Sequence, residues 1–252
     1  MGGAIVEGLV KGNYVENQDI CVSDPSYAAL ERFKANVQNI TTDNCMAAKG
    51  GEVVFVVVKP WLVEKVIKDI KEVLDYDRQT LVVVAAGITS EQLKTWLDKD
   101  GQLPAMFLSI PNIAIAQLAS MTFLVPCNAI AQQQTEQIKA LFDSMGKTIV
   151  TEEKLLGAGT TLASCGIAYA MRYIRAASEG GVELGFKADY AKEIVMQTMK
   201  GAVELLEASG LHPEAAIDLV TTPGGLTIKG LNEMEHAGFT SSVIRGLKAG
   251  AK

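Results

Sequence analysis

The chain has 252 residues, of which 48% are hydrophobic and 21% charged, with a formal net charge of −6. This length and apolar content suffice for one large domain or two modest ones with packed cores. The longest apolar runs fall far short of the roughly 20 residues that a membrane helix needs, and no basic-then-apolar leader opens the chain. The charges are mixed and form no basic cluster with interleaved aromatics, which argues against nucleic acid as a partner. We expect a globular protein of the cytoplasm.

The first helix is expected at the very start of the chain, where the small residues Gly2 and Gly3 precede apolar residues at helical spacing. About 20 residues further on, Asp24 directly follows the β-type run at residues 20–23. This spacing is the one found between a dinucleotide-binding glycine turn and its ribose-binding carboxylate. We therefore expect Gly2 and Gly3 to be the end of a G-x-G-x-x-G turn. Its opening strand and first two glycines are then not in this chain.

Residues 1–151 alternate short β-branched runs with helical stretches, the pattern of a parallel sheet covered by helices. The run at residues 53–58 is apolar on both faces, which predicts a strand in the middle of that sheet. After residue 152 the strand signals disappear and helical periodicity continues. We predict an α/β, Rossmann-like domain at 1–151 and an all-helical domain at 152–252. The predicted strands cover residues 20–23, 53–58, 81–85, 106–110, 122–125 and 148–150.

The cysteines Cys21, Cys45, Cys127 and Cys165 are scattered, with no pair at the spacing of metal ligands and no dense disulfide pattern. We expect reduced thiols and no metal site. The two histidines, His212 and His236, lie beside a predicted helix boundary and on a polar stretch. Surface or capping roles are favoured for them over catalysis.

A turn near the C-terminus combines hydroxyls, one proline and two glycines directly before an apolar helical repeat, in the order Thr221-Thr222-Pro223-Gly224-Gly225-Leu226-Thr227. We expect Thr222 to cap the following helix and Pro223 to occupy its first position. The glycines let a ligand approach backbone N–H groups that a helix start leaves unpaired, so a substrate carboxylate would fit here. An ordinary capped turn between two helices is the alternative.

Taken together, these segments resemble the pyrroline-5-carboxylate reductase family along essentially the whole chain. The resemblance implies a Rossmann-like nucleotide domain and a helical domain that forms an intertwined dimer, often assembled into rings. It also implies reduction of 1-pyrroline-5-carboxylate to L-proline by NADPH or NADH. The segments that carry it are Val57-Val58-Lys59-Pro60, Val84-Ala85-Ala86-Gly87-Ile88-Thr89, Ile110-Pro111-Asn112, Val220 to Ile228 and Gly238-Phe239.

In the family, the turn near the C-terminus binds the substrate. The resemblance therefore implies that Thr222, Gly224, Gly225 and Leu226 hold the carboxylate, and that the Thr227 hydroxyl lies near the ring nitrogen. Hydride delivery to a C=N bond needs orientation and a donor more than acid–base power, which fits the absence of an obvious His or carboxylate pair. For Thr227 the alternative is a helix threonine that bonds its own backbone.

The cofactor residues are implied in the same way, and all follow strands, where an open parallel sheet has its ligand crevice. Lys59 could instead be a solvated charge at a strand end. Ser23 and Ser26 could bind a 2′-phosphate, whereas Asp24 would repel it or bind a free ribose hydroxyl, so the choice between NADPH and NADH stays open. The expected cofactor residues are Gly2, Ser23, Asp24, Ser26, Lys59, Pro60, Ala85, Ala86, Gly87 and Asn112.

Two segments depart from the family pattern. Where the family usually has S-G-S-G-P-A-Y, this chain has Ala163-Ser164-Cys165-Gly166-Ile167-Ala168-Tyr169, so a serine and a proline are exchanged. The usual R-x-M-P-N-T-P corresponds to the segment at residues 107–114, where the arginine is absent. The roles of both segments are therefore open.

The expected loss of the first strand has an energetic consequence. In a Rossmann sheet that strand is central, so its absence leaves unpaired backbone at residues 20–23 and 53–58. Each orphaned buried N–H or C=O costs about 1–3 kcal/mol, against a total stability of about 5–15 kcal/mol. We expect a shortened version of a longer chain rather than a natural strandless form, and weaker NAD(P)H binding than in a chain with the strand restored.

Two alternatives remain. One is a β-hydroxyacid-type dehydrogenase, which would use a lysine of the interdomain helix; Lys154 and Lys192 are available but lie in no recognisable catalytic motif. The other is a non-catalytic or cofactor-impaired dimeric protein of the same fold, favoured only by the absent strand and the two altered segments.

Overall fold

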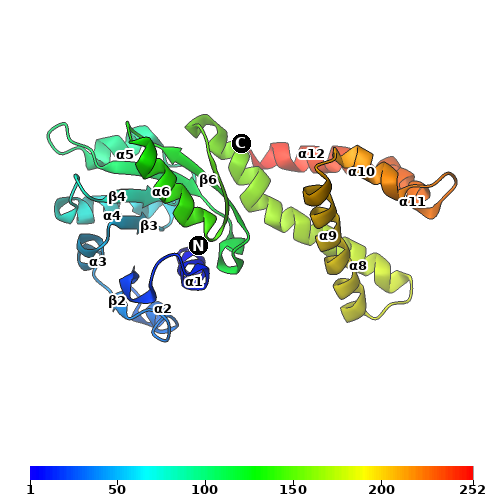
Figure 1. Ribbon diagram of the computed structural model, residues 1–252, viewed down its shortest axis with the longest axis horizontal. Coiled ribbons are helices and arrows are strands. Elements are labelled where there is room, and N and C mark those ends of the chain that lie inside the picture. The colour runs from blue at the N-terminus through cyan, green and yellow to red at the C-terminus, as the bar shows by residue number, and fades with distance from the viewer. Residues whose placement is uncertain (252) are drawn as a thin grey trace. The chain divides into compact units, whose positions relative to one another are not determined.

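The computed structural model describes residues 1–251, and Figure 1 shows the course of the chain. The chain forms two compact units, Met1–Ser164 and Cys165–Lys252. In the described part of the chain, the last strand ends at Val150, and every later element is helical. The predicted order of an α/β domain followed by helices is confirmed.

The first unit contains a five-stranded sheet of order β3-β4-β5-β6-β7 and a separate two-stranded parallel sheet of β1 and β2. The strands β3, β4 and β5 are parallel, whereas β6 is antiparallel to β5. The connection at residues 111–119 is shorter than the roughly dozen residues that a parallel crossover needs, so the chain can only turn back. The strands are β1 (Cys21–Ser23), β2 (Asn39–Thr41), β3 (Val53–Val56), β4 (Thr80–Val83), β5 (Ala105–Ile110), β6 (Ser120–Pro126) and β7 (Gly146–Val150).

The prediction that the run at residues 53–58 forms a strand in the middle of the sheet is wrong within residues 1–251. The strand β3 pairs with β4 alone, so it forms the edge of the five-stranded sheet. The strand β1 pairs with β2 alone, and no strand of residues 1–251 lies hydrogen-bonded between β1 and β3. The run is apolar on both faces because helices cover both faces of the sheet, not because strands flank it on both edges.

Side chains of the five-stranded sheet alternate between two apolar cores, as the pleat of a strand requires. On β4 and just beyond it, Leu81 and Val83 belong to one core, and Val82 and Val84 to the other. The first core is completed by α3 (Asn44–Gly50), α4 (Pro60–Ile70) and α5 (Ser90–Leu97), and the second by α1 (Gly2–Gly12) and α6 (Gln132–Asp143).

Local signals explain where these helices begin. The Asp43 carboxylate accepts hydrogen bonds from the first amides of α3. At α5, Thr89 and Gln92 form a reciprocal capping box. Pro60 stands in the first turn of α4, where its missing N–H costs nothing.

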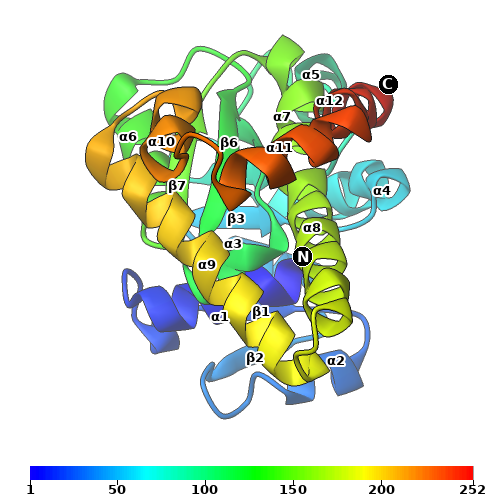
Figure 2. The same cartoon turned by 90° about the vertical axis from the view of Figure 1, so that its right-hand side faces the viewer.

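The second unit is a set of helices in which α8 and α9 run antiparallel through a short connection (Figure 2). Gly181 permits their close approach, because a Cβ placed there would lie 2.9 Å from the Ala191 Cβ. A ring contact between Tyr173 and Phe239, with centroids 6.5 Å apart, joins α8 to α12. The helices are α8 (Gly166–Glu183), α9 (Ala188–Ser209), α10 (Pro213–Val220), α11 (Leu226–His236) and α12 (Phe239–Gly250).

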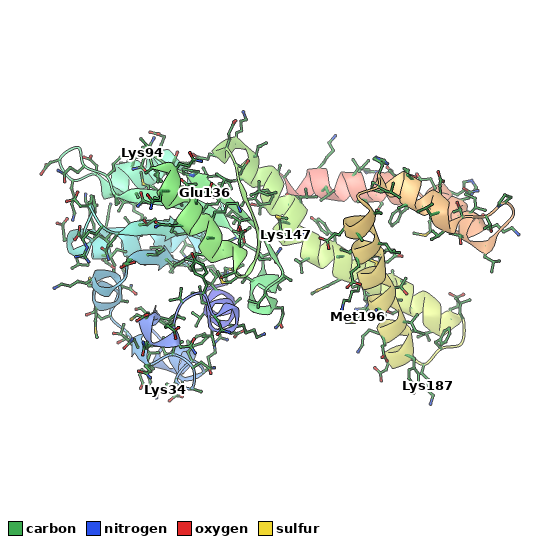
Figure 3. All side chains as sticks on the ribbon, in the orientation of Figure 1. Lys34, Lys94, Glu136, Lys147, Lys187 and Met196 are labelled. Carbon is green, nitrogen blue, oxygen red and sulfur yellow. The ribbon has the colours of Figure 1, made fainter. Side chains whose placement is uncertain are left out.

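The second unit has almost no core of its own. Among residues 165–251, Ala191 alone is buried. Met196, labelled on α9 in Figure 3, is 52% exposed, and Leu184 is 83% exposed. A helical unit with this much apolar surface is typical of a chain that packs against another protein surface.

None of the helices in residues 1–251 combines the length and the apolar character that crossing a membrane requires. Within the same residues, no three His, Cys, Asp or Glu side chains come together in a group that could hold a metal ion.

Candidate functional site

The N-terminus of α1 lies beside the chain that leaves β3. A Cβ placed on Gly2 would be 3.7 Å from the Val57 Cβ. No side chain caps α1, so the N–H groups of its first turn are available to an anion, and the helix dipole favours negative charge there. Further along α1, Gly8 allows close packing, since a Cβ there would lie 2.6 Å from the Ile115 carbonyl oxygen.

The residues after β1 form a second polar group. The Asp24 carboxylate accepts a hydrogen bond from the Ser26 amide at 2.8 Å, which fixes the turn. The Ser23 hydroxyl donates to the Asn44 side-chain oxygen at 2.8 Å. Ser26 precedes α2 (Tyr27–Glu31), and its side chain makes no capping bond. One Asp24 oxygen and the Ser26 hydroxyl therefore remain available to a ligand.

The ends of β3 and β4 lie at the same edge of the sheet, since the two strands are parallel and adjacent. Lys59 is exposed at the start of α4, and Pro60 follows it. After β4, Ala85 is buried whereas Ala86 and Gly87 are exposed. Gly87 has φ +79°, a conformation that only glycine adopts without strain.

Asn112 follows β5 and is 4% exposed. Its side chain forms hydrogen bonds within the protein. Its side-chain oxygen accepts from the Ala114 amide at 2.9 Å, and its side-chain nitrogen donates to the Ala163 carbonyl at 3.4 Å. These bonds fix the direction of the loop. One N–H of the Asn112 side-chain amide has no hydrogen-bond partner among the described residues.

The turn between α10 and α11 differs from the predicted cap. Thr222 was expected to be the N-cap with Pro223 in the first helical position, but α11 begins at Leu226 and its N-cap is Gly225. Thr222, Pro223 and Gly224 form a turn closed by a 2.9 Å hydrogen bond from the Gly225 amide to the Thr222 carbonyl. Gly224 has φ +70°, as the third position of a type II turn requires, so the Pro-Gly pair builds a turn before the helix can start.

This turn leaves the start of α11 open. Gly225 provides no side-chain cap, so the N–H groups of the first helical turn have no partner in their own helix. Thr222 and Thr227 are exposed, and the Thr227 hydroxyl makes no hydrogen bond with the described residues. The alternative of a threonine bonded to its own helix backbone is therefore not realised. The Leu226 side chain is 88% exposed.

Ser164 contacts the loop that follows β5 in the first unit and is a residue that the sequence did not indicate. Its hydroxyl donates to the Pro111 carbonyl at 3.1 Å. Nothing in the sequence indicated this contact, because a hydroxyl alone does not reveal a partner more than fifty residues away.

The other candidate groups lie outside these clusters. His212 caps α10, with its Nδ1 accepting from the Glu214 amide at 3.3 Å, and His236 is 3.8 Å from Glu233 on an exposed face. Lys154 pairs with Glu152, and Lys192 lies 3.8 Å from Asp189. No disulfide links the described cysteines, and burial raises the pKa of the Cys127 thiol to about 12, so this thiol is unsuited to nucleophilic chemistry.

An α/β unit with an uncapped helix start and polar residues at its strand ends, followed by a helical unit, is typical of a dinucleotide-dependent oxidoreductase. Comparison with protein families agrees. Residues 1–87 match the family described as NADP oxidoreductase, coenzyme F420-dependent, and residues 153–252 match the pyrroline-5-carboxylate reductase dimerisation family.

Named relatives narrow the class. The chain is 35% identical over 98% of its length to pyrroline-5-carboxylate reductase 1 of Dictyostelium discoideum, but it covers only 46% of that longer protein. It is 32% identical over its whole length to pyrroline-5-carboxylate reductase 2 of the same organism and covers 88% of it. A solved 1-pyrroline-5-carboxylate reductase of Streptococcus pyogenes is 28% identical, with a TM-score of 0.84 over 99% of this chain and 92% of that one. The chain belongs to the pyrroline-5-carboxylate reductase family.

Proposed function

We propose that the chain reduces 1-pyrroline-5-carboxylate to L-proline with NADPH or NADH. The observation that supports this most is the open start of α11, where uncapped N–H groups, Gly225 and an unpartnered Thr227 hydroxyl lie together. The site suits a small carboxylate that carries a second group able to accept a hydrogen bond. Relatives of this chain bear the name of that reductase.

The first unit is proposed to bind the cofactor, and its residues fit one. The first turn of α1 offers N–H groups to a diphosphate. Asp24 stands at the end of the next strand, where a ribose hydroxyl would be bound. Ser23 and Ser26 are proposed as further ligands on this side. At the neighbouring strand ends we assign the nicotinamide and its ribose to the group Lys59, Pro60, Ala85, Ala86, Gly87 and Asn112.

The second unit is proposed to hold the substrate. The donors are the Thr222 hydroxyl and the N–H groups of Gly224 and Leu226. The Gly225 amide is engaged in the turn, so this glycine contributes by leaving room for Thr222. The carboxylate lies in the positive field of the helix start, which fixes the orientation of the ring.

The bound nicotinamide supplies the hydride. As the hydride adds to the carbon of the C=N bond, the electron pair of that bond moves onto nitrogen. The Thr227 hydroxyl would donate a hydrogen bond to that nitrogen, and a proton taken up from water would complete the ring amine of proline. Because water supplies the proton, no His or carboxylate is required.

We further propose that the chain acts as a homodimer in the cytoplasm, with rings of dimers as the next level of assembly. Residues 153–252 match a dimerisation family, and among residues 165–251 Ala191 alone is buried, whereas residues such as Leu184 are exposed. A second copy is the simplest cover for this apolar surface. The unpaired cysteines are in keeping with a reducing compartment. Light scattering of the purified protein gives the mass that distinguishes a monomer, a dimer and a ring.

The activity is tested by initial rates of NADPH and NADH oxidation with 1-pyrroline-5-carboxylate. We expect saturable, substrate-dependent oxidation with proline as the product. Binding of the cofactor without any turnover would contradict the proposal and favour the non-catalytic alternative.

A further inference from the structure

The loop after β5 is hydrogen-bonded to the helical turn at Thr160–Cys165. Ser164 belongs to a π-helical turn at Thr160–Cys165, and its hydroxyl donates to the Pro111 carbonyl at 3.1 Å. The neighbouring residues form a second bond, from the Asn112 side-chain nitrogen to the Ala163 carbonyl at 3.4 Å. Two consecutive residues after β5 are thus fastened to two consecutive residues of the π-helical turn. Such turns are rare and occur frequently at functional sites.

The two bonds constrain different atoms of the same loop. The bond to Asn112 orients a side chain, whose oxygen also accepts from the Ala114 amide at 2.9 Å. The bond from Ser164 fixes the peptide plane between Pro111 and Asn112, because it is made to the Pro111 carbonyl. Without it, the direction of the Asn112 backbone depends mainly on the 3.2 Å bond from its own amide to the Ser120 hydroxyl.

Resting on the proposed function, we infer that Ser164 is a positioning residue for the cofactor. It holds the Pro111-Asn112 peptide so that Asn112 presents its available N–H at the strand edge assigned to the nicotinamide. Ser164 itself is not required to touch the cofactor.

The test compares Ser164→Ala with Ser164→Thr, which keeps a hydroxyl, and with Thr160→Ala. Thr160 lies in the same π-helical turn, but its hydroxyl bonds to the Leu156 carbonyl at 2.7 Å within the helical segment and not to the β5 loop. NADPH dissociation constants are measured by the fluorescence of bound NADPH. KM values for NADPH and for 1-pyrroline-5-carboxylate are measured separately.

We expect Ser164→Ala to weaken NADPH binding about fivefold, the effect of one hydrogen bond, and to leave the KM for 1-pyrroline-5-carboxylate unchanged. Ser164→Thr should restore binding, and Thr160→Ala should leave it unchanged. Equal effects of Ser164→Ala and Thr160→Ala would overturn the inference, as would a rise in both KM values.

A separate measurement tests the role of Ser164 if the proposed function is wrong. If the unsubstituted protein binds no NADPH, the proposed function fails, and hydrogen exchange at the amides of Ala114 and Ile115 tests whether Ser164 positions the loop after β5. Faster exchange in Ser164→Ala than in Thr160→Ala supports the role, and equal exchange overturns it.

Discussion

The Thr222 carbonyl accepts a hydrogen bond from the Gly225 amide at 2.9 Å, and the Thr222 hydroxyl occupies the space where a side chain of Gly225 would begin. A Cβ on Gly225 would collide with that hydroxyl and lie 3.0 Å from the carbonyl oxygen. Glycine at this position therefore allows a threonine hydroxyl to lie beside the uncapped start of α11. The proposed carboxylate site depends on this contact.

Gly225→Ala is expected to displace Thr222 and to raise the KM for 1-pyrroline-5-carboxylate about tenfold or more, with little change in the KM for NADPH. Gly230→Ala is the matched control, because Gly230 lies in the same helix and a Cβ there has no neighbour within 4 Å. That control should stabilise the helix by about 0.5–1 kcal/mol. Equal KM values in the two variants would argue against a carboxylate site at this turn.

Thr227→Ala should lower kcat by about 100-fold, since it removes the donor proposed for the ring nitrogen. Thr227→Ser should retain most of the activity, because the hydroxyl is kept. Thr240→Ala serves as a control, as the Thr240 hydroxyl already donates to the Glu235 carboxylate at 2.8 Å. Steady-state rates at saturating substrate measure the effect, and an active Thr227→Ala variant would remove Thr227 from the mechanism.

Asp24→Asn tests cofactor choice. The substitution removes a negative charge at the proposed ribose site and retains an oxygen that can accept from the Ser26 amide. Because a 2′-phosphate is repelled by a carboxylate, the ratio of kcat/KM for NADPH to that for NADH should rise about tenfold. The ratio is obtained from parallel initial-rate measurements. An unchanged ratio would place Asp24 away from the ribose.

The free edges of β1 and β3 lead to a prediction for a lengthened chain. Each strand has one partner strand only, so a segment added before Met1 could pair with both. A version that carries an added strand and the residues G-x-G-x should bind NADPH at least about tenfold more tightly, because more backbone N–H groups then contact the diphosphate. Calorimetric titration of both versions provides the comparison. Equal affinity would show that the added residues do not complete the nucleotide site.

The sequence predicted most of the α/β unit because its strands are strongly apolar runs, such as Leu81 to Val84. It missed β2, a three-residue strand whose only large apolar residue is Ile40. The apolar faces of β3 indicated a central strand, since helices on both sides produce the same composition. Its unpaired edge was indicated only by the expected absence of the first strand.

For the candidate site, local chemistry was predictable and long-range contacts were not. The glycines of the turn indicated an open helix start, but the turn type, set by Pro223 and Gly224, moved the cap from Thr222 to Gly225. The bond between Ser164 and Pro111 joins residues far apart in the chain, so no spacing in the sequence could have indicated it.

Transfer of deuterium from the cofactor to the product tests whether this protein is a reductase. With NADPH deuterated on the transferred position of the nicotinamide, we expect L-proline with one deuterium on the ring carbon that was doubly bonded to nitrogen, formed in step with NADPH oxidation. Proline without deuterium, or NADPH oxidation without proline, would contradict direct hydride transfer by this protein.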